Sequence, residues 1–407
     1  MGEVWRALLG FPLLLTDLII GPFLLLWGVD KLVNDRIIRM GRVGRMIALF
    51  LFLLVLTYLL NAFRFSFTEI RPALPYLIRF GAYVSMAFVT FDLIERYPQK
   101  PLRLTLVVMM VLSALVIALF GFLQLRFFPS FLELGLHLEG WDPHIGRLLS
   151  TWFDPNFVGG LFAFVSPMAI AVGIYYHRER KWMHFLIAGL VSILLMSALY
   201  YTFSRSSYLA LVVALGVLSF LKSRTLLVAG FILVLIAFSV SGRVQERVLS
   251  GVDSAIAIFS SESQKPVDPT AQLRLDSWSH GMEIALDYPL IGAGYGRYPF
   301  EMQSRGYGNL TDHAIGGSDS SLLTIWANAG VFSLLAYLAV GFVAATLSIR
   351  RIFLHPKTLR SYLDAGVVAG FAGMMLHSQF VNSLLFALIM VYLYVAIALL
   401  DEVKINS

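Results

Sequence analysis

The amino-acid sequence predicts an all-α polytopic membrane protein with about 11–12 transmembrane helices and one large, partly helical outer loop. The first observation is composition: 58% of the 407 residues are hydrophobic and 14% are charged, with a mean hydropathy of +0.78. A soluble globular chain carries about 25% charged residues. The second is a series of apolar runs of bilayer-spanning length, and the third is an alternation of positive charge between them. This composition excludes a soluble enzyme and a disordered chain, and the absence of cysteine excludes a disulfide framework and thiolate metal sites.

About 20 apolar residues cross a bilayer core as a helix. We expect a helix at each of eleven apolar runs: 8–29, 46–63, 73–94, 102–122, 157–176, 183–201, 207–221, 225–241, 321–348, 362–380 and 383–400. Pro12, Asp17 and Pro22 interrupt the first run, so a re-entrant hairpin is the alternative there. The runs divide the chain into an N-terminal bundle of about eight spans at 1–241, a loop at 242–320, and about three C-terminal spans at 321–407.

The connections between the runs differ in positive charge. Of the 31 Lys and Arg residues, 18 fall in one alternating set of connections, 7 in the short segments of the other set and 6 in 242–320. The set of 18 is Lys31, Arg36, Arg39, Arg42, Arg45, Arg96, Lys100, Arg103, Arg178, Arg180, Lys181, Lys222, Arg224, Arg350, Arg351, Lys357, Arg360 and Lys404. Since cytoplasmic loops carry the excess of Lys and Arg, we expect this set to face the cytoplasm and 123–156 and 242–320 to lie outside. The net charge of +6 thus reflects topology, and no nucleic-acid partner is expected.

The outer loop 242–320 is the longest connection, and the cytoplasmic connections are too short for a catalytic domain. Ordered loops longer than about 15 residues are usually functional. Aromatic residues indicate that this loop folds: Trp278, Tyr288, Tyr295, Tyr298, Phe300 and Tyr307. The spacing of apolar residues predicts a helix over 271–287 that ends before Pro289. We therefore expect the functional groups on the outer side.

Four arginines lie at or near the predicted outer boundary: Arg79, Arg147, Arg205 and Arg274. A guanidinium stays charged when partly desolvated, and its fork of donors matches phosphate oxygens. Together the four suit the diphosphate of a lipid. The alternative is an arginine that reaches the headgroups or pairs with a carboxylate; we favour it for Arg79 and Arg147, but not for Arg205 in its very short turn between two spans.

Gly292, Gly294 and Gly296 follow Pro289 in the loop. A phosphate-binding P-loop would need a lysine and a preceding strand, and both are missing here. The glycines then indicate a tight backbone approach, either to a ligand or to neighbouring helices.

Asp319 and His313 precede the run 321–348. At this position a carboxylate or an imidazole could act as the general base for an acceptor hydroxyl. The alternatives are helix N-capping by Ser318, Asp319 and Ser320, and a solvated loop histidine at His313. No His or carboxylate pair has zinc-ligand spacing, and the outer loops contain no Asp-x-Asp pair, so we expect neither a metal nor another cofactor.

These segments, in this order, resemble the O-antigen ligase and polymerase family of bacterial cell-envelope glycan enzymes. The resemblance is carried by Arg147 to Asn156, by Thr202 to Ser207, by Arg274-x3-Trp278 with Pro289-x2-Gly292-x-Gly294, and by Asp319 to Gly330. It implies a metal-independent transferase with a glycosyltransferase C-like fold in the bacterial inner membrane, with its active site on the periplasmic side. The donor would be a glycan on undecaprenyl diphosphate and the acceptor a glycan or lipid-linked glycan; a chain-length regulator or a flippase is the implied protein partner.

In this resemblance Arg205 and Arg274 take the positions of the family's diphosphate-contacting arginines, and Arg147 and Arg79 would assist them. Asp319 or His313 would orient or deprotonate the acceptor. Ligases of the family typically have His-Asn where this chain has Asp319-Ser320, which favours a polymerase of O-antigen, capsule or exopolysaccharide over a ligase that modifies the lipid A-core of lipopolysaccharide. A transporter for an anionic lipid or solute and a non-catalytic scaffold are alternatives of other classes. The absence of inverted repeats argues against the transporter, and the aromatic loop argues against the scaffold.

Overall fold

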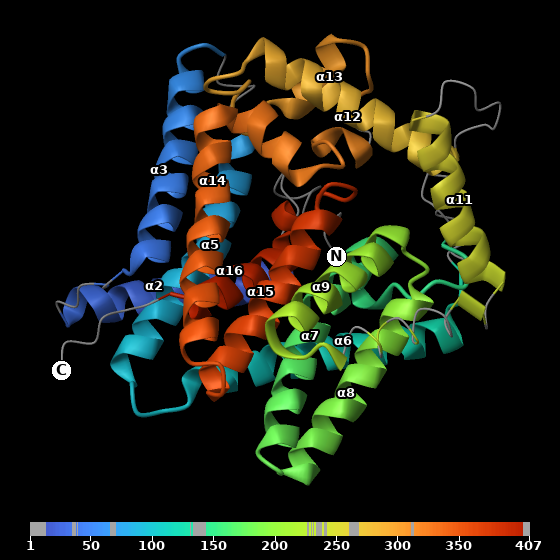
Figure 1. Ribbon diagram of the computed structural model, residues 1–407. Coiled ribbons are helices and arrows are strands. Elements are labelled where there is room, and N and C mark those ends of the chain that lie inside the picture. Colours follow the sequence, from blue (N-terminus) through green and yellow to red (C-terminus); the bar gives the residue numbers. More distant parts are fainter. Residues whose placement is uncertain are drawn as a thin grey trace. The chain divides into compact units, whose positions relative to one another are not determined.

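The fold is described from a computed structural model of the chain (Figure 1). It describes residues 14–34, 38, 40–65, 71–130, 132, 144–225, 228, 230, 232, 238–239, 242–259, 268–310 and 313–401. Regular structure in these residues is helical, and the protein is an all-α polytopic membrane protein, as the sequence predicts.

The helices follow the apolar runs closely. They are α2 (Leu15–Val33), α3 (Arg42–Ala62), α5 (Ala73–Arg96), α6 (Leu102–Phe127), η3 (Ser150–Trp152), α7 (Pro155–Arg178), α8 (Trp182–Tyr201), α9 (Arg205–Lys222), α11 (Gly242–Phe259), α12 (Pro269–Asp287), α13 (Tyr298–Ser304), η4 (His313–Gly316), α14 (Ser321–Leu354), α15 (Leu359–His377), η5 (Ser383–Leu385) and α16 (Ala387–Leu399). Each predicted run coincides with a helix, except 225–241, much of which lies outside the described residues. Residues 8–13 of the first run, for which a re-entrant hairpin was the alternative, lie outside the described residues, and the rest of the run lies in α2, with Pro22 inside this helix.

Seven of these helices are long and apolar enough to cross a membrane: α3, α5, α6, α7, α8, α9 and α14. Helix α2 carries Asp17, Asp30 and Lys31, and α16 has only 13 residues, so neither qualifies by length and composition. The search covers only the described residues. The total of 11–12 spans extends beyond these seven and stays a prediction.

The chain folds into two compact units. Unit 1 comprises Met1–Leu102, Asp276–Leu347 and Leu384–Ser407, and unit 2 comprises Arg103–Leu275 and Ser348–Ser383. Helices α12 and α14 each contribute residues to both units. The division of the chain at 241 and 320 is a division by membrane topology, and it too stays a prediction.

The centre of unit 2 is formed by α7 and α15. Helix α15 packs against α7 and α9, and α7 also packs against α8 and α9 (Figure 1). Glycines permit this approach, because a Cβ on Gly370 would lie 2.2 Å from the carbonyl oxygen of Phe164, and one on Gly373 would lie 2.5 Å from that of Ala210. Small residues at such crossings are typical of membrane helix bundles. The polar ends of these close-packed helices are therefore held in fixed positions.

In unit 1, α5 packs against α2, α3 and α16. Phe50 of α3 lies edge-on to Phe80 of α5 and to Tyr337 of α14, with ring centroids 5.9 and 5.1 Å apart, in a favourable aromatic geometry. A buried ion pair between Lys31 and Asp92 joins α2 to α5. Apolar packing and paired charge thus both hold this unit.

The predicted helix over 271–287 is α12, which ends at Asp287, before Pro289. The glycine-rich segment that follows packs its backbone against a kink in α14, where Gly330 has φ 78° and ψ 173°. Gly292 has φ +71°, and a Cβ there would lie 2.4 Å from the amide nitrogen of Ala329. The amide of Gly294 donates to the carbonyl of Asn328 at 3.0 Å. Of the two alternatives for these glycines, the approach to a neighbouring helix is therefore the one observed.

Candidate functional site

Arg205 is the first residue of α9 and follows a tight turn from α8. In this turn Phe203 has φ +48°, and Arg147 supports it by donating from Nε to the carbonyl of Thr202 at 2.8 Å. Nη1 of Arg205 donates to Oγ of Ser250 on α11 at 3.0 Å. The side chain is only 16% exposed. Its guanidinium is therefore directed into unit 2.

Asp268 is the carboxylate that faces this guanidinium. Nη2 of Arg205 donates to its Oδ1 at 3.0 Å. The same oxygen accepts from the amides of Thr270 and Ala271, at 3.0 and 3.3 Å, and so caps the N-terminus of α12. Burial alone would raise the pKa of the Asp268 carboxyl, but the hydrogen bond and charge of Arg205, with the two amides, hold this pKa below its usual range. One carboxylate thus joins the start of α9 to the start of α12.

A chain of hydrogen bonds runs through unit 2 from Arg147 to His377. Nη2 of Arg147 donates to Oδ1 of Asn156 at 3.4 Å, and Ser204 Oγ donates to the same oxygen at 2.9 Å. Ser207 Oγ lies 3.0 Å from Ser204 Oγ and 3.2 Å from Nε2 of His377. Arg147, both serines and His377 are buried. This polar chain fixes the residue that precedes Arg205 against α7 and α15.

Arg274 lies on α12, two turns beyond the Asp268 cap, and its side chain is half-buried. It interacts electrostatically with His377, at the other end of the hydrogen-bond chain. Three of the four predicted arginines, Arg147, Arg205 and Arg274, therefore lie in unit 2, where Asp268 pairs with Arg205 at the start of the helix that carries Arg274.

Arg79 belongs to unit 1, where its guanidinium forms a two-pronged pair with Asp17. Nε donates to Oδ1 at 3.0 Å and Nη2 donates to Oδ2 at 2.6 Å. The hydroxyl of Tyr83 donates to the same carboxylate at 2.6 Å. Pairing with a carboxylate, the alternative considered for Arg79 from the sequence, is thus present and joins α2 to α5.

Asp319 and His313 also belong to unit 1. Ser320 Oγ accepts from an amide of the first turn of α14 at 3.3 Å, so this serine supplies the predicted N-cap. The amide of Asp319 donates to Oγ of Ser277 on α12 at 2.9 Å, which fixes this residue beside α12. Burial, and to a lesser degree the nearby charge of Asp319, raise the pKa of Tyr298. His313 opens η4, and its side chain lies outside the described residues.

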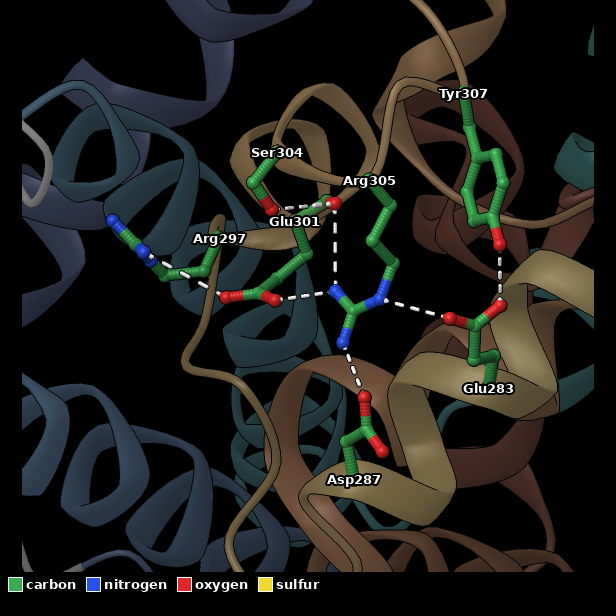
Figure 2. A network of polar contacts seen from close by, with 7 residues as sticks. All are labelled: Glu283, Asp287, Arg297, Glu301, Ser304, Arg305 and Tyr307. Atoms are coloured by element: carbon green, nitrogen blue, oxygen red, sulfur yellow. Dashed lines mark hydrogen bonds and ion pairs between the residues drawn. The ribbon is translucent and has the colours of Figure 1, made fainter.

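The loop also contains a network centred on Arg305, which the sequence interpretation did not single out (Figure 2). Arg305 contacts three carboxylates: Glu301 and Asp287, each at 2.5 Å, and Glu283 at 3.3 Å. The hydroxyl of Tyr307 donates to Glu283 at 2.6 Å. Since Glu283 and Asp287 lie on α12 and Glu301 lies on α13, this guanidinium joins the two helices. The i,i+4 spacing of Glu301 and Arg305 was the only local signal for it.

Asp268, which pairs with Arg205 and caps α12, was also not identified from the sequence. The sequence signal for it is the Asp-Pro-Thr step at 268–270, since an Asp before Pro is a typical N-cap. Among the described residues, no group of three or more His, Asp or Glu side chains is arranged to hold a metal ion.

A family model described as O-antigen ligase matches residues 190–338, which extend from α8 to α14 and include Arg205, Arg274 and Asp319. No curated protein matches the chain. The match agrees, over these residues, with the predicted resemblance to the O-antigen ligase and polymerase family.

Proposed function

We propose that the protein is a metal-independent glycosyltransferase that polymerises a glycan carried on undecaprenyl diphosphate at the periplasmic face of the bacterial inner membrane. In this proposal it has a glycosyltransferase C-like fold and extends O-antigen, capsule or exopolysaccharide chains. The observation that carries the proposal is the joint placement of Arg205 and Arg274. These arginines are 69 positions apart in sequence, yet both lie in unit 2, because Arg205 pairs with Asp268 at the start of α12, the helix that carries Arg274.

The reaction needs cations because its leaving group is a diphosphate. The acceptor hydroxyl oxygen attacks the anomeric carbon, the bond from this carbon to the diphosphate oxygen breaks, and undecaprenyl diphosphate leaves with the electron pair. Arg205 and Arg274 stabilise the charge that grows on the leaving oxygens, an interaction worth roughly 3–4 kcal/mol for each preorganised donor. Attack opposite the leaving group would invert the anomeric centre.

The donor diphosphate would replace the carboxylate of Asp268 as the partner of Arg205. Asp268 already presents an anion to this guanidinium at 3.0 Å, so the position accommodates negative charge. Arg147 supports the turn and Arg79 is paired with Asp17, so we assign both a secondary part in diphosphate binding. Asp319 or His313 would accept the proton of the acceptor hydroxyl, a contribution of roughly 10²–10⁴-fold.

The test is transfer by the purified protein, reconstituted with a lipid-linked oligosaccharide and no added metal or nucleotide. Arg205→Ala and Arg274→Ala should each lower the transfer rate by about 10²-fold or more. Arg126→Ala is the matched control, because Arg126 is exposed and predicted to lie on the same side. Wild-type rates in the Arg205 and Arg274 variants would refute the proposed site, and donor movement across the bilayer without transfer would favour the transporter.

A ligase that attaches glycan to the lipid A-core is the second candidate, because the matched family model is described as O-antigen ligase. The two activities leave different products in a strain that lacks the protein. Single repeat units on the lipid carrier should accumulate if it is a polymerase. Full-length polymer on the carrier would instead identify a ligase.

A further inference from the structure

At the end of unit 2 opposite Arg205 lies a second group of cations, for which the proposed transferase activity has no use. We propose that this group, here called the basic cluster, binds the phosphate of an anionic phospholipid headgroup. It consists of Arg178, Lys222, Arg351 and Arg360, with Tyr362 and Asp364 between them. Arg205 and Lys222 are the first and last residues of α9, a separation of about 26 Å at 1.5 Å per residue.

Lys222 is half-buried, and its ammonium group has only neutral direct partners. Nζ donates to Oγ of Ser361 at 2.5 Å and to the carbonyl of Pro356 at 3.0 Å. It also lies 4.3 Å from the ring centroid of Tyr362. Among the described residues, no carboxylate lies within ion-pair distance of it. Asp364 attracts this ammonium only from beyond ion-pair distance. A partly buried charge without a direct ion pair is costly, and an anionic ligand would offset this cost.

Arg178 supplies a second cation to the same place. Its Nη1 donates to the hydroxyl of Tyr362 at 3.3 Å, so the two cations contact opposite parts of one side chain. Like Lys222, it has no carboxylate within ion-pair distance among the residues described. The pair presents a charge of +2, and the nearby carboxylate, Asp364, attracts Lys222 without forming an ion pair with it.

The nearby carboxylate, Asp364, is already paired with the other two cations of the basic cluster. Nε of Arg351 and Nε of Arg360 pair with the two oxygens of Asp364 at 2.8 and 2.9 Å, and that carboxylate is only 2% exposed. One carboxylate therefore serves two guanidinium groups, and the four cations of the basic cluster gather around it. A phosphodiester, with its single negative charge and several acceptor oxygens, fits such a surplus better than a further carboxylate of this chain.

Aromatic residues at the same end of the bundle indicate headgroup depth. The ring of Tyr175 lies 5.6 Å from that of Tyr362, and Trp182 begins α8 nearby, with its side chain exposed. Tyr and Trp are enriched where a membrane protein crosses from hydrocarbon to headgroups, and basic pockets between helices at this level bind lipid phosphates. The depth and the chemistry both favour a lipid as the source of the phosphate.

The experiment uses the full-length protein in detergent, stripped of lipid and titrated with phosphatidylglycerol, phosphatidylcholine or inorganic phosphate. Native mass spectrometry counts bound lipid, and the unfolding temperature reports stabilisation. Wild-type protein should retain phosphatidylglycerol and be stabilised by it more than by phosphatidylcholine. The double variant Arg178→Gln, Lys222→Gln should bind phosphatidylglycerol about tenfold more weakly.

The matched control is Lys100→Gln, Lys357→Gln, which removes two exposed cations predicted to lie on the same side of the membrane. Lys222→Arg as a single substitution keeps the charge and should therefore bind phosphatidylglycerol as the wild-type protein does. The proposal would be overturned if the double variant and the control lost phosphatidylglycerol binding equally. It would also be overturned if the wild-type protein showed no preference for phosphatidylglycerol over phosphatidylcholine. Stabilisation by inorganic phosphate alone, to the same extent as by phosphatidylglycerol, would overturn the lipid as the source.

Discussion

Asp268 has two structural roles, and they can be separated by a single substitution. Its carboxylate caps α12 through two amides and pairs with Arg205 through one hydrogen bond. Asparagine is nearly as good an N-cap as aspartate, but it carries no charge. Asp268→Asn therefore removes the ion pair and keeps the cap, whereas Asp268→Ala removes both.

The ion pair should show itself in the pH dependence of stability. Because the pKa of Asp268 is held below its usual range in the folded protein, the pair contributes stability above the unfolded pKa of about 3.9 and loses it as the pH falls through the folded value. We expect Asp268→Asn to lower the free energy of unfolding at pH 7 by about 0.5–1 kcal/mol, since the pair is partly exposed to solvent. Thermal unfolding of both proteins between pH 3 and 7 measures this difference. A difference that does not shrink below about pH 4 would contradict the assignment.

The sequence identified Arg205 and Arg274 because their side-chain chemistry suits a diphosphate wherever they lie. It did not identify Asp268 as the partner of Arg205. The carboxylate contacts Arg205 from a position 63 residues away, and no local pattern reports such a pairing. Residue type thus suggested the two cations, while the pairing of Arg205 with Asp268 was accessible only from the fold.

At the scale of elements, the outer loop depends on the junction of α12 and α13. Arg305 is the one residue in Figure 2 that contacts carboxylates on both helices. Burial lowers the pKa of Arg305, but its bonds to Glu301 and Asp287 raise it above the ordinary value, so the guanidinium stays charged. Without this charge, the side chain of Glu301, which is buried, would keep only Arg297 as a charged partner within the network drawn.

Arg305→Ala should therefore loosen α13 from α12. We expect the backbone amides of 298–305 to exchange with deuterium at least tenfold faster, because leaving a buried charge with a weaker partner costs several kcal/mol. Hydrogen exchange read by mass spectrometry measures the change. Arg305→Lys is the matched control for charge, and its single ammonium cannot bridge three carboxylates, so its exchange rates should lie between those of the other two proteins. Unchanged exchange in Arg305→Ala would show that apolar packing alone holds α13.

The helices could be predicted from the sequence, whereas their interruptions could not. Helix α12 was predicted over 271–287 because apolar spacing and Pro289 are local signals, and the structure extends it by only two residues, to Pro269. The kink at Gly330 of α14 has no such signal. A Cβ at this position would lie 2.1 Å from the carbonyl oxygen of Leu290 and would clash with it. Tertiary packing, and not the local sequence, brings Leu290 to this place.

At the scale of the whole molecule, the positions of the cations in unit 2 can be compared with the sides of the membrane that the charge count predicts for them. The basic cluster draws its cations from three connections that the charge count assigns to the cytoplasm, and these meet at one end of the bundle of α7, α9 and α15. Arg147 and Arg205, assigned to the opposite side, meet at the other end of the same bundle. The grouping in space agrees with the alternation of the connections within unit 2, while the side of the membrane that each end faces stays a prediction.

The orientation can be tested directly, because the chain contains no cysteine and any introduced thiol is unique. We expect Gln303→Cys, in α13, to react with a membrane-impermeant maleimide in intact spheroplasts. Lys357→Cys, between α14 and α15, should react only after the membrane is permeabilised. Both side chains are exposed, so a difference in labelling reports the side of the membrane and not burial. Ser166→Cys, at a position with no exposure in the middle of α7, should stay unlabelled in both states. The reverse pattern would place the basic cluster outside, and with it would remove the periplasmic position on which the proposed transfer reaction depends.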